Sequence, residues 1–139
     1  MVDLDWHDYY EIGIDFIDSA HQEILAVMRA VREAIHAGNH DERLSLSRDL
    51  AAMIENHFKS EEAFLDEVNF PGLKEHVEYH KELLVQANQI TEVCKEIDMT
   101  SNLTELFEAM EQFLVDDIFS GDIAFKFFLE YNGLIPRKI

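Results

Sequence analysis

Two pairs of potential metal ligands lie close together in the middle of the chain. His57 and Glu61 are four residues apart, and so are His76 and His80. On an α-helix this spacing puts both members of a pair on one face, about one turn apart. Imidazole nitrogen and carboxylate oxygen are common ligands of iron, manganese and zinc. Pro71-Gly72, between the pairs, would end one helix and let the next turn back, so the two pairs would face a common interhelical space.

His21 supplies a further candidate ligand from a separate segment. Ile24, Leu25 and Met28 follow it at the spacing of one helical face, so His21 lies close to a buried stripe. Burying several imidazoles and carboxylates without a metal would require many hydrogen-bond partners. Four-helix bundles solve this problem by holding metal ions in their cores. The ligand types and spacings therefore indicate a metal site inside a helical bundle.

The rest of the pattern predicts the elements that would position these ligands. Residues 1–18 form an irregular arm rich in aromatic side chains, without a sustained helical period. Four amphipathic helices are predicted, from Asp18-Ser19 to Gly38, from Asp41 to Asn69, from Leu73 to Ile97 and from Leu103 to Asp117-Ile118. Ser120-Gly121 is expected to break the chain after the fourth helix. A short final helix over Ala124 to Leu129 follows, with Asp122 as its cap. We expect an all-α, up-down-up-down four-helix bundle that forms one domain over residues 1–139.

Composition and charge narrow the function classes. The formal charge of −18, from 29 acidic against 11 basic residues, repels phosphate and anionic lipid, so we expect no nucleic-acid partner. The sequence contains no apolar run of about 18 residues and therefore predicts no membrane span. The N-terminus is acidic and does not resemble a secretory signal. The single cysteine, Cys94, cannot form an internal disulfide, and we expect a cytoplasmic protein.

The segments that carry the ligands resemble those of the hemerythrin-like family, and of the bacterial hemerythrins in particular. The resemblance covers nearly the whole chain and includes flanking residues as well as ligands. Its motifs are the arm from Trp6 through Gly13-Ile14-Asp15, the segment Asp18-Ser19-Ala20-His21, the run His57-Phe58-Lys59-Ser60-Glu61-Glu62, and Phe70-Pro71 followed by His76 and His80.

This resemblance implies a cofactor and a ligand for it. The cofactor is a pair of iron ions joined by an oxo or hydroxo bridge, with an open position for dioxygen. By the resemblance, one iron is bound by His21 and His57, the other by His76 and His80, and Glu61 and Asp122 bridge the two. The apolar lining of the oxygen pocket is implied to consist of Ile24, Phe58, Phe113, Leu114 and Ile118.

One position departs from the family pattern. The family has a histidine five residues before the bridging aspartate, and this chain has Asp117 there. Carboxylate oxygen is a good ligand for iron or manganese, but the side chain is shorter than histidine. On a regular helix, Asp117 and Asp122 would also lie about 140° apart, although Ser120-Gly121 could distort the chain. Either Asp117 binds the metal, or that position is filled by water or is empty.

Two further side chains are candidates for contacts to the ligands. Glu62 is rotated by about 100° from Glu61 on a helix, so we expect it to be solvated or to contact the ligands from behind. The Tyr79 hydroxyl could donate a hydrogen bond at the edge of the site, although ordinary packing is the simpler explanation.

The leading hypothesis is a non-haem di-iron protein that binds dioxygen for sensing, storage or delivery, rather than an enzyme. If Asp117 binds iron, the added anion stabilises the ferric state and favours autoxidation over oxygen release. One alternative is a di-iron oxidase or peroxidase, because a carboxylate-rich site is typical of such enzymes. The other is a metal-binding signalling module without reversible oxygen binding. The native metal is iron or manganese, and a signalling domain or partner protein is expected if the chain belongs to a longer sensor.

Overall fold

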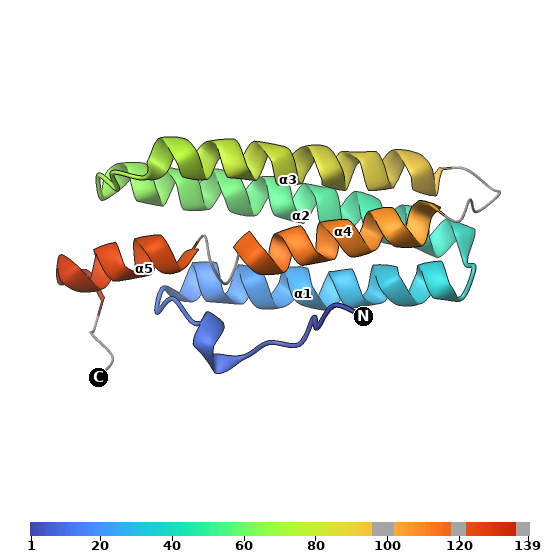
Figure 1. Ribbon diagram of the computed structural model, residues 1–139, viewed down its shortest axis with the longest axis horizontal. Helices are drawn as coiled ribbons and strands as arrows, with labels where there is room; N and C mark the ends of the chain where they lie inside the picture. Colours follow the sequence, from blue (N-terminus) through green and yellow to red (C-terminus); the bar gives the residue numbers. More distant parts are fainter. Residues whose placement is uncertain (96–101, 118–121, 136–139) are drawn as a thin grey trace.

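The computed structural model describes residues 1–95, 102–117 and 122–135, and every regular element in these ranges is helical (Figure 1). A short 3-10 helix, η1 (Asp8–Tyr10), precedes α1 (Asp15–His36), α2 (His40–Glu67), α3 (Leu73–Cys94), α4 (Asn102–Asp116) and α5 (Asp122–Tyr131). Helices α1 to α4 run side by side, each antiparallel to the one before, and α5 lies beyond the C-terminal end of α4. The predicted all-α bundle with a short C-terminal helix is confirmed.

The antiparallel order brings the candidate ligands to one end of the bundle. The beginnings of α1 and α3 lie beside the C-terminal ends of α2 and α4 (Figure 1). His21 is in the second turn of α1, and His76 and His80 are in the first turns of α3. His57 and Glu61 are in the C-terminal half of α2. Ligands far apart in the sequence therefore meet because each helix reverses the direction of its predecessor.

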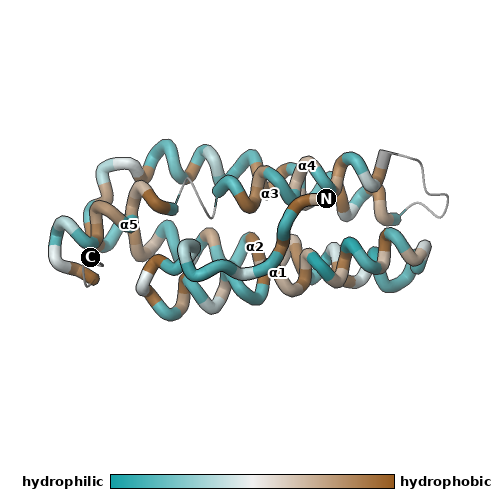
Figure 2. Tube along the Cα trace, turned by 60° about the horizontal axis from the view of Figure 1, so that its bottom comes forward, coloured by the Kyte–Doolittle hydropathy of each residue, from teal (hydrophilic) through white to brown (hydrophobic). Residues whose placement is uncertain are grey.

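Two apolar clusters enclose this end of the bundle from both sides. The larger cluster fills the bundle and contains Ile24, Phe58, Leu83 and Leu114. The buried members of the smaller cluster are Ile12, Ile17, Leu65, Phe125, Leu129 and Ile135. Figure 2 shows the apolar positions recurring along each helix among polar ones, as amphipathic helices require. Along α1, α2 and α3 the candidate ligands lie between a residue of one cluster and a residue of the other, so apolar side chains flank the ligands on both sides.

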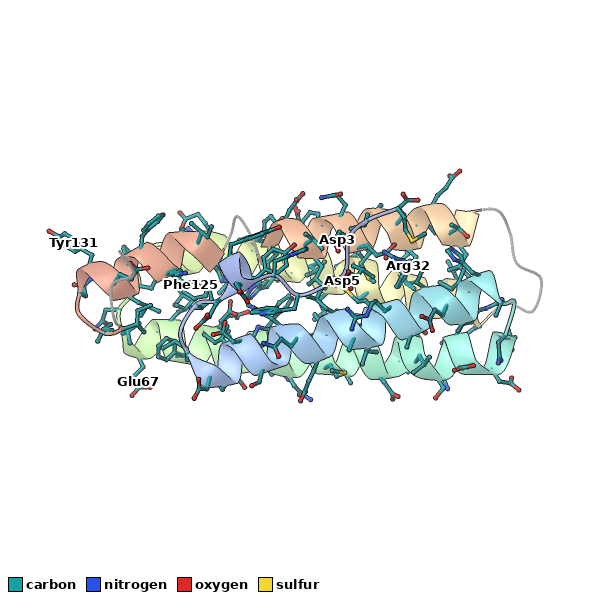
Figure 3. All side chains as sticks on the ribbon, turned by 90° about the horizontal axis from the view of Figure 1, so that it is seen from below. Asp3, Asp5, Arg32, Glu67, Phe125 and Tyr131 are labelled. Atoms are coloured by element: carbon teal, nitrogen blue, oxygen red, sulfur yellow. The ribbon has the colours of Figure 1, made fainter. Side chains whose placement is uncertain are left out.

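The N-terminal arm is attached to two different helices. Arg32 of α1 donates a hydrogen bond to the backbone carbonyl of Val2 near the start of the arm. Figure 3 labels Arg32 together with Asp3 and Asp5 of the same arm. Lys126 of α5 donates to the backbone carbonyl of Glu11 at 2.6 Å near its end. Charged donors make the stronger class of hydrogen bond. The arm therefore connects α1, which carries His21, to α5.

Helix α1 begins earlier than the sequence indicates, at Asp15 rather than at Ser19. The carboxylate of Asp18 does not cap the helix. It accepts hydrogen bonds from the backbone N–H groups of Ile12 at 2.8 Å and Gly13 at 3.0 Å. Asp18 therefore satisfies the arm's backbone, and the helix starts without a side-chain cap.

Other helix ends differ from expectation in smaller ways. The side chain that caps α2 is Asn39 rather than Asp41, and it accepts a hydrogen bond from the backbone N–H of Glu42 at 3.1 Å. Helix α3 ends at Cys94 rather than Ile97, and α5 spans Asp122–Tyr131 rather than Ala124 to Leu129, with Asp122 as its first residue. The expected break at Ser120-Gly121 lies outside the described residues. None of the helices in the described ranges combines the length and the apolarity needed to cross a lipid bilayer.

Candidate metal centre

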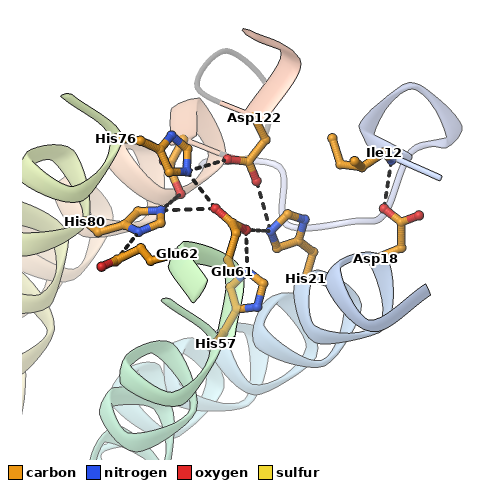
Figure 4. A network of polar contacts seen from close by, with 10 residues as sticks. Ile12, Asp18, His21, His57, Glu61, Glu62, His76, His80 and Asp122 are labelled. Atoms are coloured by element: carbon orange, nitrogen blue, oxygen red, sulfur yellow. Dashed lines mark hydrogen bonds and ion pairs between the residues drawn. The ribbon is translucent and has the colours of Figure 1, made fainter. Parts of the chain in front are cut away.

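All seven predicted metal ligands converge in one cluster between the two apolar layers. Figure 4 labels each of them except Asp117. None of their side chains is more than 7% exposed. They are His21, His57, Glu61, His76, His80, Asp117 and Asp122. Such deep burial of four imidazoles and three carboxylates is tolerated only where each group has a partner.

Glu61 is at the centre of the cluster and divides the histidines into two pairs (Figure 4). Its Oε2 lies 2.9 Å from His57 Nε2 and 3.6 Å from His21 Nε2. Its Oε1 lies 2.6 Å from His76 Nε2 and 3.3 Å from His80 Nε2. Each carboxylate oxygen therefore faces one histidine pair, which is the arrangement of a carboxylate that bridges two ions.

Asp122, the first residue of α5, repeats this division. Its Oδ2 lies 3.1 Å from His21 Nε2, and its Oδ1 lies 3.4 Å from His76 Nε2. Ligand atoms of His21, His57 and Glu61 lie within 4.8 Å of one another, and the same holds for a second group that Glu61 forms with His76, His80 and Asp122. Two adjacent positions for a cation share Glu61.

Asp117 lies on one side of the cluster only. Its Oδ2 is 3.8 Å from His80 Nε2, next to the pair formed by His76 and His80. The 140° separation expected for Asp117 and Asp122 does not apply, because α4 ends at Asp116 and α5 begins at Asp122. The two aspartates do not share one regular helix, and both carboxylates reach the cluster.

Whether the residues fit bound metal follows from the buried polar atoms that have no hydrogen-bond partner. Among the described residues, Nε2 of His57 and of His80, Glu61 Oε2, Asp117 Oδ1 and both carboxylate oxygens of Asp122 have no hydrogen-bond partner. The close approach of His57 Nε2 to Glu61 Oε2 lacks hydrogen-bond geometry. Leaving a buried polar group unsatisfied costs about 1–3 kcal/mol. A cation at each of the two positions would satisfy these atoms, so the donor set fits a pair of metal ions.

Comparison with known proteins identifies the family. The family model described as the hemerythrin HHE cation binding domain matches residues 12–122, a range that contains all seven clustered residues. This chain belongs to that family. The resemblance predicted from the sequence motifs is thereby confirmed.

Individual relatives support the family membership. Bacteriohemerythrin of Campylobacter jejuni is 26% identical over 100 residues, which cover 70% of this chain and 73% of that protein. Myohemerythrin of Riftia pachyptila is 28% identical over 86 residues, covering 62% of this chain and 67% of that protein. Bacteriohemerythrin of Clostridium acetobutylicum is 22% identical over 123 residues, covering 84% and 94%. No solved structure matches this hemerythrin-family chain.

The pKa values of the groups in the centre are shifted by burial and by the close approach of carboxylates and histidines. Burial disfavours the charged form of His21, but contacts with Asp122 and Glu61 outweigh this and raise its pKa to about 10. Burial and the charge of Glu61 raise the pKa of Asp122 well above its usual range, and burial raises the pKa of Asp117 to about 6. Despite burial, the surrounding histidines hold the pKa of Glu61 well below its usual range. The centre thus attracts positive charge, as a cation site must.

Glu62 has a more specific position than the sequence indicated. Its Oε2 lies 2.8 Å from Nδ1 of His80 (Figure 4). Its rotation of about 100° from Glu61 directs it toward α3, because α3 packs along that flank of α2. In the sequence, this contact was indicated by the fact that Glu62 directly follows the predicted ligand Glu61. By contrast, the Tyr79 hydroxyl donates to the backbone carbonyl of Phe113 at 3.3 Å, so it contacts α4 rather than a ligand.

The structure describes four of the five predicted oxygen-pocket residues. Ile24, Phe58 and Leu114 are buried members of the larger apolar cluster, and Phe113 packs against it. Ile118 lies outside the described residues. The ring of Phe58 stacks on the imidazole of His80, with ring centroids 3.6 Å apart. That these side chains enclose dioxygen stays a prediction.

Proposed function

We propose that this chain binds two iron ions and, through them, dioxygen, for oxygen sensing, storage or delivery. One observation carries this proposal: Glu61 and Asp122 each direct one carboxylate oxygen toward each of two positions lined by histidines. A site for a single ion would not require both carboxylates to divide their oxygens in this way. The hemerythrin-family relatives support the choice of iron over manganese.

Each side chain has a defined role in this proposal. His21 and His57 would hold one ion, and His76, His80 and Asp117 would hold the other. Glu61 and Asp122 would each offer one oxygen to each ion. The ion held by His21 and His57 would have fewer protein ligands and therefore a position for an external molecule. When bound, the iron pair supplies electrons and an open coordination position for dioxygen.

The protein around the ions controls how long oxygen stays bound. Ile24, Phe58 and Leu114 exclude water and therefore slow the delivery of protons to the site. Asp117 acts in the opposite direction, because an additional buried carboxylate stabilises ferric over ferrous iron. We infer that this chain oxidises after taking up oxygen more readily than a site with histidine at position 117.

The same carboxylate favours a second candidate function. Three carboxylates surround four histidines, and a carboxylate-rich di-iron site is typical of oxidases and peroxidases. In that function the site would turn over hydrogen peroxide or oxidise an added substrate. Steady-state consumption of hydrogen peroxide by the iron-loaded protein distinguishes this enzyme from an oxygen-binding protein.

Rapid mixing of the iron-loaded, reduced protein with dissolved dioxygen tests the leading proposal. We expect an iron charge-transfer absorption band to appear after mixing. This band should then decay, leaving the spectrum of the ferric protein. Failure of any band to appear would contradict dioxygen binding. A band that persists for hours would contradict the inferred effect of Asp117, while leaving the oxygen-binding function in place.

A further inference from the structure

Glu62 lies outside the ring of proposed ligands, yet its side chain contacts one of them. Glu62 Oε2 accepts a hydrogen bond from Nδ1 of His80 at 2.8 Å, and the carboxylate is half-buried beside α3 (Figure 4). Glu61 and Glu62 are consecutive, so α2 directs one carboxylate into the centre and the next one behind a histidine of the neighbouring helix. The contact therefore links the two helices at the back of the centre.

This hydrogen bond determines which nitrogen of His80 faces the centre as an acceptor. Because Nδ1 donates to Glu62, Nε2 of the neutral ring carries the lone pair. That lone pair faces Glu61 Oε1 at 3.3 Å and Asp117 Oδ2 at 3.8 Å. Three acceptors directed at one point repel one another unless a cation lies among them. The hydrogen bond from Glu62 thus prepares His80 for metal.

The ring of His80 is also fixed in orientation from a second side. Phe58 stacks face to face on the imidazole, with the ring centroids 3.6 Å apart and the planes 1° from parallel. A face-to-face contact is favourable when one ring carries positive charge, as an imidazole bound to a metal cation does. Phe58 restricts tilting of the ring, and Glu62 restricts its rotation.

The other histidine pair lacks this support. Nδ1 of His21 and Nδ1 of His57 are buried and have no hydrogen-bond partner among the residues that the structure describes. A carboxylate behind a metal-bound histidine orients the ring and makes it a stronger ligand, and removing such a partner typically weakens metal binding by about 10- to 100-fold. The missing hydrogen-bond partners behind His21 and His57 are therefore enough to give the two ions different binding affinities.

We propose that Glu62 is a positioning residue that acts through His80 and makes the ion bound by His76 and His80 the more tightly held of the two. This inference rests on the proposed two-ion function. Glu62 itself touches neither ion. Its effect comes from the hydrogen-bond acceptor that it places on Nδ1, which keeps Nε2 directed at the ion and increases its strength as a ligand.

Three variants separate the possible causes. E62M keeps the length of the side chain but removes the acceptor, and E62Q keeps an oxygen acceptor but removes the charge. E55M makes the same change two turns earlier on α2, at an exposed residue whose carboxylate pairs only with Lys59 in the described part of the chain, at 3.2 Å. Anaerobic titration of the metal-free proteins with Co²⁺, followed by visible absorption, measures the affinity of each position.

We expect the unaltered protein and E55M to bind two Co²⁺ ions with the same pair of affinities. In E62M the tighter affinity falls by about 10- to 100-fold, and the weaker one stays unchanged. E62Q recovers most of the loss, because its amide oxygen accepts the hydrogen bond from His80. Rescue by glutamine is the sign of positioning, since a purely structural defect would lower unfolding stability without acting on one ion alone.

Other outcomes overturn the inference. E62M that binds both ions as tightly as the unaltered protein excludes a role for Glu62, and equal weakening of both ions excludes an effect through His80. If E62M loses its helical circular dichroism, E62A takes its place with the same expected result. If the unaltered protein binds only one Co²⁺, the two-ion proposal fails separately. In that case Glu62 is judged by whether E62M weakens that single ion.

Discussion

The two halves of the candidate metal centre share two carboxylates but differ in what lies behind the histidines. The half formed by His76 and His80 also contains Asp117 and is supported by Glu62. The half formed by His21 and His57 has neither. A surface hollow of about 350 Å³ between α1 and α2 has His57 in its lining, along with Ile24 and Met53. One half has an additional buried carboxylate and a carboxylate behind His80, and the other borders a surface hollow.

This difference has a simple electrostatic consequence. Additional buried anions stabilise higher positive charge on the nearer ion, because charges interact strongly where little water screens them. The ion with fewer protein ligands keeps a coordination position for a small molecule. In a pair of ions with unequal surroundings, one ion can therefore be held firmly by the protein while the other binds the small molecule.

The largest expected effect comes from removing the carboxylate that the two halves share. In Glu61→Ala both positions lose a ligand, so we expect near-complete loss of both ions, measured as iron per chain after gel filtration. Glu67→Ala, which removes an exposed carboxylate at the end of the same helix, is the matched control and should retain the iron. Two tightly bound iron ions in Glu61→Ala would contradict the bridging role.

Removing Phe125 tests the apolar layer behind the half formed by His76 and His80. Phe125 is fully buried, and its ring lies edge-on to His76 with centroids 5.4 Å apart. Truncation of a buried phenylalanine costs about 3–5 kcal/mol, so Phe125→Ala should lower the free energy of unfolding by that amount in urea denaturation. Phe127→Ala, two residues on and 66% exposed, should change it by no more than about 0.5 kcal/mol. Equal effects of the two changes would contradict the packing.

Changing Asp117 to histidine removes the additional carboxylate that only one half of the centre contains. We expect Asp117→His to slow the oxidation of the oxygenated protein by about tenfold or more, which corresponds to about 1.4 kcal/mol in the barrier. Stopped-flow absorption measures the rate. Asp116→His changes the exposed neighbouring residue and should leave the rate unaltered. A rate in Asp117→His equal to or faster than that of the unaltered protein would show that the Asp117 carboxylate does not promote oxidation.

The smallest expected effect concerns how the shared Asp122 is held. Lys126 lies one turn after Asp122 on α5 and is hydrogen-bonded to the arm, so Lys126→Met loosens the helix that carries a ligand of both ions. We expect a loss of about 1 kcal/mol in unfolding stability and a slight, equal weakening of both ions in the Co²⁺ titration. Lys81→Met, at an exposed lysine that pairs with Glu78 within α3, is the control. Weakening confined to one ion would contradict a shared role for Asp122.

The sequence predicted the ligands better than it predicted their surroundings. The spacing of His57 with Glu61 and of His76 with His80 is a local property of a helix, so one face could be assigned without the fold. The contact of Glu62 depends on which helix packs beside it, and no spacing within α2 contains that information. Asp18 was misassigned as a helix start for a similar reason, because its partners are backbone groups of the arm.

Asp117 shows a second limit. The rotation of about 140° between Asp117 and Asp122 applies to a regular helix, and the sequence allowed for a distortion at Ser120-Gly121 without giving its effect. In the structure α4 ends at Asp116 and α5 begins at Asp122, and both carboxylates reach the cluster. Two statements from composition stay predictions: that the whole chain forms a single domain, and that the protein is cytoplasmic. Neither depends on a contact that the structure describes.

The Mössbauer spectrum of the protein loaded with isotopically enriched iron tests most directly whether two unequal, carboxylate-bridged ions are present. We expect two iron sites of equal population for the oxidised protein. Their quadrupole splittings should differ, and a small applied field should reveal no net magnetism because the bridged ions are antiferromagnetically coupled. A spectrum of isolated, magnetically uncoupled ferric ions would contradict a centre in which Glu61 and Asp122 are shared by two ions.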